Sequence, residues 1–167
     1  MNATPQLRPA ARHETEALVE LAVSTGLFTP DEADLLLRQT LEALHAGTLG
    51  ADHHAFVAAD EPGEPRGWVY FAKRNEPDEP WDLWWIGVAP AHHGTGVGTA
   101  LLAFVEDFVR ARSGRVLYIE TSSDDKLAAT RAFYRRRGYA EAGQVADFYA
   151  QGEDKIVFAK AFEPGAR

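Results

Sequence analysis

The 167-residue sequence contains no cysteine. Disulfide bonds, thiolate metal sites and a cysteine nucleophile are therefore excluded. No stretch approaches the roughly 20 consecutive apolar residues that a membrane-spanning helix requires. The opening residues, MNATPQLRPAARHE, also lack the apolar core of a secretion signal. We therefore expect a protein with no membrane partner and a cytoplasmic location.

Basic residues are also scarce, since 17 lysines and arginines face 25 aspartates and glutamates, for a formal net charge of −8. A nucleic-acid-binding domain needs a basic face, so nucleic acid is not an expected partner. The negative charge would instead attract a cationic molecule. The positive charges that do gather are Arg131, Arg135, Arg136 and Arg137. They form either a solvated helix face or a contact to a nucleotide phosphate.

Residues 83–102, LWWIGVAPAHHGTGVGTALL, combine a strand, a loop and a helix. A buried strand is expected over residues 83–88, Pro90 interrupts it, and a helix is expected from about Gly98. The glycines at positions 94, 96 and 98 can adopt positive φ and let a ligand approach the backbone. The first N–H groups of a helix have no intrahelical partner and lie at the positive end of its dipole. This stretch therefore predicts a phosphate site.

Two other glycine-rich phosphate sites fit this spacing less well. A P-loop requires Gly-Lys-Ser/Thr at the helix start, whereas Thr99 and Ala100 follow Gly98. A dinucleotide-binding fingerprint requires a third glycine where Thr99 stands, and an acidic residue about 20 positions further on, where Glu120 lies. A nicotinamide-dependent oxidoreductase therefore stays open as an alternative.

The hydrophobic pattern of the whole chain predicts alternating strands and helices. We expect strands at residues 6–8, 54–59, 67–73, 83–88, 116–121, 139–145 and 155–161, and helices at 14–23, 30–46, 98–113 and 126–137. This order predicts an α/β fold class: one twisted, mixed sheet with helices on both faces, in a single domain over residues 1–167.

Short sequence motifs predict a helix start, a buried helix face and a loop in more detail. Thr29, Pro30 and Glu32 form a capping box at the start of the second helix. Its buried stripe is expected to contain Leu35, Leu36, Leu41 and Leu44. Trp84 and Trp85 point to opposite faces of their strand, which implies that both faces are covered. A loop with Asp147, Phe148 and Tyr149 is expected between the last two strands.

Two motifs resemble those of the GNAT superfamily of N-acetyltransferases. Residues 88–102 resemble the family's acyl-CoA pyrophosphate loop, with His93 where the family commonly has Arg or Gln. Downstream, Phe133-Tyr134 is followed after three residues by Gly138-Tyr139, as in many GNAT enzymes. The resemblance implies a GNAT-like acyl-CoA N-acyltransferase fold of about seven strands with four helices packed on both faces. It also implies transfer of an acetyl group from acetyl-CoA to a primary amine.

The resemblance further implies which residues hold the cofactor, with the pantetheine along the strand and the diphosphate on the loop amides. The implied cofactor-binding residues are Ile86, Gly87, Val88, His93, Gly94, Thr95, Gly96, Val97, Gly98 and Thr99. A non-catalytic CoA-binding or regulatory module would carry the same loop and is a further alternative. No metal is expected, because adjacent histidines such as His92 and His93 diverge and no third ligand has suitable spacing.

Acetyl transfer needs a proton donor for the departing thiolate, and a tyrosine hydroxyl suits a thiol of pKa about 8.5. GNAT enzymes often place a tyrosine at the position of Tyr134, which makes it the candidate donor. The alternative is that Tyr134 is only a packing residue. Ile119-Glu120 resembles the pair that supplies the general base in the GNAT branch acting on protein amino termini. Otherwise Glu120 is a surface carboxylate. We expect a small-molecule or peptide amine as acceptor, and the sequence is compatible with a homodimer.

Overall fold

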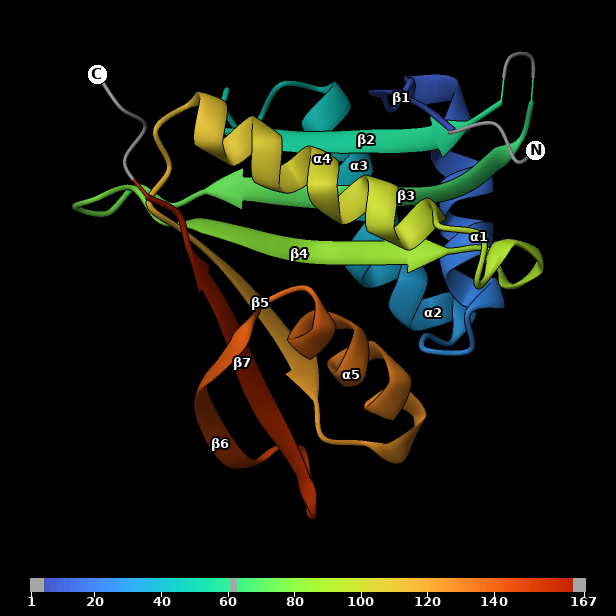
Figure 1. Cartoon of the computed structure of the whole chain (residues 1–167). Coiled ribbons are helices and arrows are strands. Elements are labelled where there is room, and N and C mark those ends of the chain that lie inside the picture. Colours follow the sequence, from blue (N-terminus) through green and yellow to red (C-terminus); the bar gives the residue numbers. More distant parts are fainter. Residues whose placement is uncertain (1–4, 61–62, 164–167) are drawn as a thin grey trace. The chain divides into compact units, whose positions relative to one another are not determined.

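The computed structural model describes residues 5–60 and 63–163, which form a mixed α/β fold (Figure 1). Among these residues, hydrogen bonds join seven strands into one sheet in the order β1-β2-β3-β4-β5-β7-β6. Contacts divide the chain into two compact units, Met1–Ala72 with Trp85–Phe108 and Lys73–Trp84 with Val109–Arg167. Strand β4 passes from the second unit into the first between Trp84 and Trp85. A single domain over residues 1–167 stays a prediction.

The element order confirms the predicted fold class. The strands are β1 (Gln6–Pro9), β2 (His53–Ala59), β3 (Pro65–Lys73), β4 (Trp81–Val88), β5 (Val116–Ser122), β6 (Ala140–Ala150) and β7 (Glu153–Ala161). The helices are α1 (Thr15–Ser24), α2 (Pro30–Ala33), α3 (Gln39–His45), α4 (Val97–Ala111) and α5 (Ala128–Arg136). A π-helical segment, Asp34–Arg38, joins α2 to α3, so these two form one continuous helix. No helix in the described part of the chain is long and apolar enough to cross a membrane.

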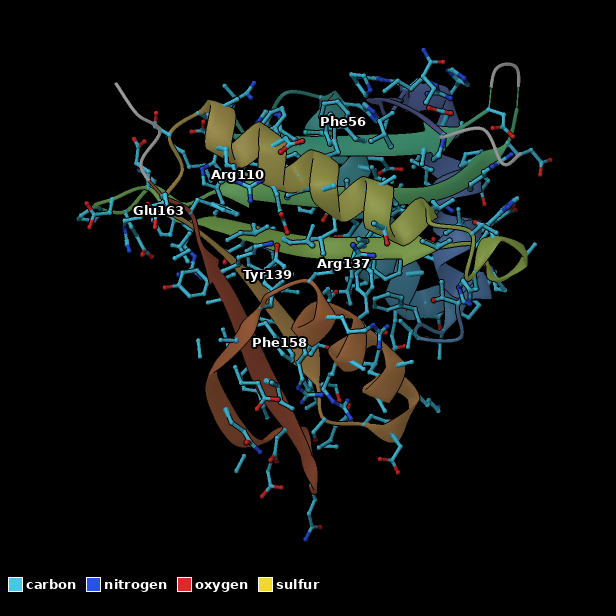
Figure 2. All side chains as sticks on the ribbon, in the orientation of Figure 1. Phe56, Arg110, Arg137, Tyr139, Phe158 and Glu163 are labelled. Atoms are coloured by element: carbon cyan, nitrogen blue, oxygen red, sulfur yellow. The ribbon has the colours of Figure 1, made fainter. Side chains whose placement is uncertain are left out.

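In the first unit, helices cover both faces of the sheet (Figure 1). Alternate residues of a strand face opposite ways. Val57 and Trp68 belong to the core beneath α1, where Trp68 Nε1 donates a hydrogen bond to the Leu18 carbonyl at 3.0 Å. Phe56, labelled in Figure 2, lies on the other face, and its ring centroid is 4.5 Å from that of Phe104 on α4. The sheet thus separates an aliphatic and tryptophan core from a phenylalanine core.

The predicted start of the second helix is confirmed. The Thr29 N–H donates to the Glu32 carboxylate at 2.8 Å, and the Glu32 N–H donates to Thr29 Oγ1 at 3.3 Å. Pro30 is the first helical residue. These reciprocal bonds satisfy two N–H groups that a helix start would otherwise leave unpaired.

The predicted leucine stripe of this helix is partly wrong. Leu35 and Leu36 are 61% and 53% exposed, whereas Leu37 is buried. Leu37 lies four and seven residues before Leu41 and Leu44 and therefore shares their helix face, whereas Leu35 and Leu36 do not. Between α2 and α3 the Gln39 N–H donates to the Asp34 carbonyl five residues back, as in a π-helix. The side chains that face the core are Ala33, Leu37, Leu41 and the partly buried Leu44.

In the second unit, α5 packs on one face of the strands β5, β7 and β6. Ile119 of β5 lies opposite Phe158 of β7, and both are buried. The Phe158 ring, labelled in Figure 2, is 5.6 Å from the ring of Tyr134 on α5. Glu120 follows Ile119 directly and therefore points to the opposite face. The helix ends as predicted at Gly138, whose φ is +86°.

The predicted loop at Asp147, Phe148 and Tyr149 is wrong, because β6 continues to Ala150. The strand is irregular there: its register against β7 shifts between Val145 and Ala150, and Asp147 has a φ of +52°. The Asp154 carboxylate holds this bulge by accepting the Asp147 N–H at 2.9 Å. A side-chain hydrogen bond thus replaces the regular ladder. Every residue of β6 is exposed, and the homodimer stays a prediction.

Trp84 corrects the prediction that both faces of β4 are covered. Trp81 and Trp85 are 1% and 7% exposed, but Trp84 is 61% exposed. The ring of Trp85 lies 5.7 Å from that of Trp68 in the core of the first unit. The side chains therefore alternate as expected, but Trp84 itself is exposed to solvent, whereas Asp82 on the same face of the strand is buried.

Candidate functional site

The glycine loop leads from β4 into α4 within the first unit. After Val88 the chain makes a 3-10 turn, Pro90–His92, in which the His92 N–H donates to the Ala89 carbonyl at 2.8 Å. Gly94 and Gly96 have φ of +73° and +88°. A Cβ added to either would meet no atom within 4 Å. These glycines are therefore required by the backbone conformation, and the space beside them is open.

His93 closes the loop upon itself. Its Nε2 donates a hydrogen bond to the Val88 carbonyl at 2.8 Å, which requires a proton on that nitrogen because a carbonyl only accepts. Its N–H donates to the Pro90 carbonyl at 3.2 Å. The Thr95 hydroxyl donates to the His92 carbonyl at 2.6 Å. The side chains of His93 and Thr95 therefore shape the loop from within.

The helix start offers further backbone donors. The first intrahelical bond runs from the Ala100 N–H to the Gly96 carbonyl at 2.9 Å. The amides of Val97 and Gly98 come before it and have no carbonyl four residues back in the helix. The residues from His93 to Gly96 are exposed, whereas Val97 is buried. The exposed turn and the helix dipole together favour an anion at this point.

Gly67 of β3 sets the depth of this helix start. A Cβ at Gly67 would lie 2.7 Å from the Gly87 carbonyl oxygen and 3.1 Å from side-chain atoms of both Val97 and Leu101. Only glycine therefore lets the first turn of α4 pack so closely on the sheet. This role of Gly67 was not predicted from the sequence, although a glycine within a strand is a known sign of close backbone approach.

The three strand residues assigned to the cofactor differ in their surroundings. Ile86 and Val88 are half-buried and Gly87 is buried. A Cβ at Gly87 would lie 2.2 Å from Cζ2 of Trp85, so the indole ring covers this glycine. The absence of a side chain at Gly87 thus has a packing reason in the first unit.

Tyr134 is buried in the second unit, with 3% of its surface exposed. Its ring lies 5.6 Å from Phe158 and 6.0 Å from Tyr139, the two residues labelled beside α5 in Figure 2. Burial raises the pKa of the Tyr134 hydroxyl above its ordinary value. Tyr134 is thus a neutral phenol at physiological pH.

Glu120 forms an ion pair on the other face of the same strands. Glu120 Oε2 lies 2.8 Å from Lys155 Nζ, and the two side chains are 40% and 16% exposed. The ammonium group of Lys155 also lies 3.8 Å from the centroid of the Phe148 ring. Burial, and secondly the Glu120 carboxylate, raise the pKa of Tyr149, which adjoins this group. Lys155 was not predicted from the sequence, because no local pattern identifies it.

The structure does not bring Glu120 and Tyr134 together on one surface, because they lie on opposite faces of the β5, β7 and β6 strands.

The arginine cluster predicted from the sequence has partners close by in the chain. The Arg131 guanidinium donates to the carbonyls of Ser122 and Asp124 at 2.7 and 2.8 Å, and Arg135 pairs with Glu141. Arg131 therefore stabilises the turn between β5 and α5. Among the described residues, no group of three or more His, Asp or Glu side chains could hold a metal ion.

Comparison with known proteins agrees with these features. The family described as "Acetyltransferase (GNAT) family" matches residues 16–139. The N-alpha-acetyltransferase RimI of Mycobacterium tuberculosis is 33% identical over 103 residues, which are 60% of this chain and 61% of that protein. The chain thus matches about three fifths of the length of this curated relative.

Solved structures resemble the chain over nearly its full length. A crystal structure assigned to the GNAT family from Desulfovibrio desulfuricans has a TM-score of 0.86 and 31% identity, covering 93% of this chain and 98% of that chain. An aminoglycoside 6'-N-acetyltransferase complexed with coenzyme A has a TM-score of 0.74 at 17% identity, covering 97% of this chain and 99% of that chain. At that identity the second likeness concerns the fold alone.

Proposed function

The chain belongs to the GNAT family of acetyltransferases, and on that premise we propose that it transfers an acetyl group from acetyl-CoA to a primary amine. The observation that carries the proposal is the exposed turn at Gly94 and Gly96, with positive φ at both glycines and the start of α4 directly behind it. The aminoglycoside acetyltransferase of the same fold that binds coenzyme A supports acetyl-CoA as the donor.

The diphosphate of CoA accepts hydrogen bonds from backbone N–H groups of the glycine turn. Because the amides of His93 and Thr95 already donate within the loop, at 3.2 and 3.4 Å, the amides of Gly94, Gly96, Val97 and Gly98 are the ones we assign to the phosphate oxygens. Thr99 completes the first turn, and His93 holds the loop in shape through Val88. The pantetheine arm runs along the backbone of Ile86, Gly87 and Val88, where amide and carbonyl groups match its own amides.

The reaction moves protons from the amine and to the thiolate. An alkyl amine of pKa about 10.4 is an ammonium ion at pH 7, and its deprotonation costs on the order of 4 to 5 kcal/mol, against about 1 for a chain-terminal amine. Glu120 accepts that proton, the neutral nitrogen attacks the thioester carbonyl, and the C–S bond breaks as the nitrogen loses its second proton to water. Tyr134, on the other face of the β5, β7 and β6 strands, donates its proton to the thiolate and regains one from water, so Glu120 and Tyr134 act without contact with each other. No metal takes part.

The acceptor is a small-molecule or peptide amine. RimI, the 33%-identical relative, is by its name an N-alpha-acetyltransferase, which favours a peptide amino terminus. The structural relative that acts on aminoglycosides favours a small molecule. A panel of both kinds of amine is therefore needed.

Thermal unfolding with cofactors tests the proposal first. Acetyl-CoA and CoA at about 100 times their Kd should stabilise the protein by about 2.7 kcal/mol, whereas NADH and NADPH should not. Release of free thiol with an amine panel then tests the transfer. Binding of acetyl-CoA without thiol release from any amine would favour the alternative, a CoA-binding or regulatory module, and stabilisation by NADH alone would contradict CoA binding.

A further inference from the structure

The continuous helix from α2 to α3 exposes two leucines on its solvent side. Leu35 and Leu36 are each more than half exposed, and among the described residues the other large apolar side chains exposed to this extent are Trp84 and Phe148. The core-facing side of the helix is already filled by other residues, Leu37 among them. A surface helix normally carries polar residues opposite its buried face. The packing of the chain itself therefore does not explain the two exposed leucines.

Carboxylates flank these leucines along the same side of the helix. Asp31 lies four residues before Leu35, and Glu32 lies four residues before Leu36, so each acid neighbours one leucine on the helix surface. Glu42 is exposed two helical turns after Leu35. We call Asp31, Glu32, Leu35, Leu36 and Glu42 the acidic leucine face.

The positive charge of this helix is already paired. Its arginine, Arg38, lies 2.8 Å from Glu16 Oε2 and 2.7 Å from Asp34 Oδ1. In the described part of the chain, no lysine or arginine pairs with Asp31 or Glu42. The acidic leucine face therefore combines apolar surface with negative charge that the chain does not neutralise.

We propose that the acidic leucine face is a docking surface for an amphipathic helix of a partner protein. Apolar residues of that helix would cover Leu35 and Leu36, and its arginines or lysines would pair with the carboxylates on either side. The inference goes beyond the proposed function, because the face contains none of the residues assigned to acetyl-CoA or to the proton transfers.

The charge of the face selects this partner over other occupants. A second copy bound by two-fold symmetry would bring Asp31, Glu32 and Glu42 close to the same carboxylates of the first, because such a contact uses the same patch twice. Anionic lipid and nucleic acid would be repelled. The arginine-bearing helix α5 of a second copy has suitable charge, but its Tyr134 is buried against Phe158 and cannot cover a leucine.

Isothermal titration calorimetry with a designed peptide tests the proposal on the full chain. The probe is an amphipathic helical peptide of leucine and arginine, acetylated at one end and amidated at the other, so it has no amine that could accept an acetyl group. Wild type should bind it at low ionic strength, and added salt should weaken the binding. Leu35→Gln/Leu36→Gln should bind about thirtyfold more weakly, because two exposed leucines no longer become buried.

Val145→Thr is the matched control for the loss of exposed apolar surface. Val145 is nearly half exposed on β6, outside the acidic leucine face, and this variant should bind the peptide as wild type does. Glutamine is close to leucine in helix propensity, so Leu35→Gln/Leu36→Gln should unfold at the wild-type temperature. It should also bind acetyl-CoA as wild type does, which separates this inference from the proposed function.

A pair of charge reversals separates local pairing from the net charge of the protein. Glu42→Lys and Glu64→Lys change the net charge equally, and both residues are exposed, but Glu64 lies outside the helix, just before β3. Glu42→Lys should weaken peptide binding by about tenfold, and Glu64→Lys should leave it nearly unchanged.

Three results would overturn the inference. The first is equal peptide affinity of wild type and Leu35→Gln/Leu36→Gln, or no binding by wild type. The second is equal weakening by Glu42→Lys and Glu64→Lys, which would mean that the peptide responds to net charge alone. The third is a wild-type dimer in sedimentation velocity that Leu35→Gln/Leu36→Gln abolishes, because a second copy would then be the occupant.

Discussion

The hydroxyl of Tyr134 is neutral at physiological pH, and burial raises its pKa. If it protonates the departing thiolate, Tyr134→Phe should lower kcat by about a hundredfold. The affinity for CoA should not change, since the ring packs equally well without its oxygen. Thiol release measures kcat, and isothermal titration calorimetry measures CoA binding.

Tyr139→Phe is the matched control, because Tyr139 is also 3% exposed and its ring neighbours that of Tyr134. This variant should keep kcat close to wild type. Full activity of Tyr134→Phe would leave the tyrosine with a packing role only.

Gly96 contributes through its backbone conformation alone. Its φ is +88° and its Cβ position is empty, so alanine there is strained but does not clash. Gly50 has a φ of +87° and an equally empty Cβ position away from the loop. We expect both alanine variants to lose about 1 to 2 kcal/mol of stability. Only Gly96→Ala should also lose CoA affinity, by more than about tenfold, and equal CoA binding by both variants would exclude the loop as the diphosphate site.

At the scale of elements, the continuous helix from α2 to α3 buries one face, which contains Leu37 and not Leu36. Leu37 is 7% exposed and Leu36 is 53% exposed. Leu37→Ala should therefore lower the free energy of unfolding by about 2 to 5 kcal/mol, and Leu36→Ala by less than about 0.5. Urea denaturation measures both. A larger loss from Leu36→Ala than from Leu37→Ala would instead support the stripe predicted from the sequence.

Glu14, the residue before α1, is joined to β1 by hydrogen bonds. Its carboxylate accepts two hydrogen bonds from Arg8, at 2.7 and 2.6 Å, and one from the Ala11 N–H at 2.9 Å. The bond from Arg8 is the main cause that lowers the pKa of Glu14 from its ordinary value of 4.5. The stabilisation is therefore complete above pH 4.5 and is lost as the pH falls through the lower, folded pKa.

Glu14→Gln should reduce stability by about 1 to 2 kcal/mol at pH 6. The difference from wild type should shrink as the pH falls from 6 to 3, because protonation removes the same charge from the native protein. Urea midpoints at the two pH values measure it. A difference that stays constant with pH would show that packing, rather than the ionised carboxylate, is responsible.

The features predicted correctly from the sequence are local. The capping box at Thr29 and the glycine turn into α4 each depend on residues within a few positions of one another. Lys155 meets Glu120 only because β5 and β7 pair in a particular register, and Gly67 meets Val97 only because α4 packs on β3. Such contacts between distant segments leave no periodic signal. The bulge at Asp147 was also hidden, because the Asp154 carboxylate that holds it lies on the next strand.

At the scale of the whole molecule, the GNAT fold is built from two compact units that share β4. The first unit carries the glycine turn and the start of α4. The second carries Tyr134, Glu120 and Lys155. Donor binding and the proton transfers are therefore assigned to different units, so variants in one should affect CoA affinity and variants in the other should affect kcat or the acceptor KM.

The most direct measurement compares acetyl-CoA, acetyl-dephospho-CoA and acetyl-pantetheine by isothermal titration calorimetry. All three carry the thioester and the pantetheine arm, but only the first two carry the diphosphate. If amides of the glycine turn bind the diphosphate, acetyl-CoA and acetyl-dephospho-CoA should both bind about a hundredfold more tightly than acetyl-pantetheine. Gly96→Ala should remove most of that difference. Equal affinity for acetyl-CoA and acetyl-pantetheine would contradict the assignment of this turn as the acetyl-CoA site.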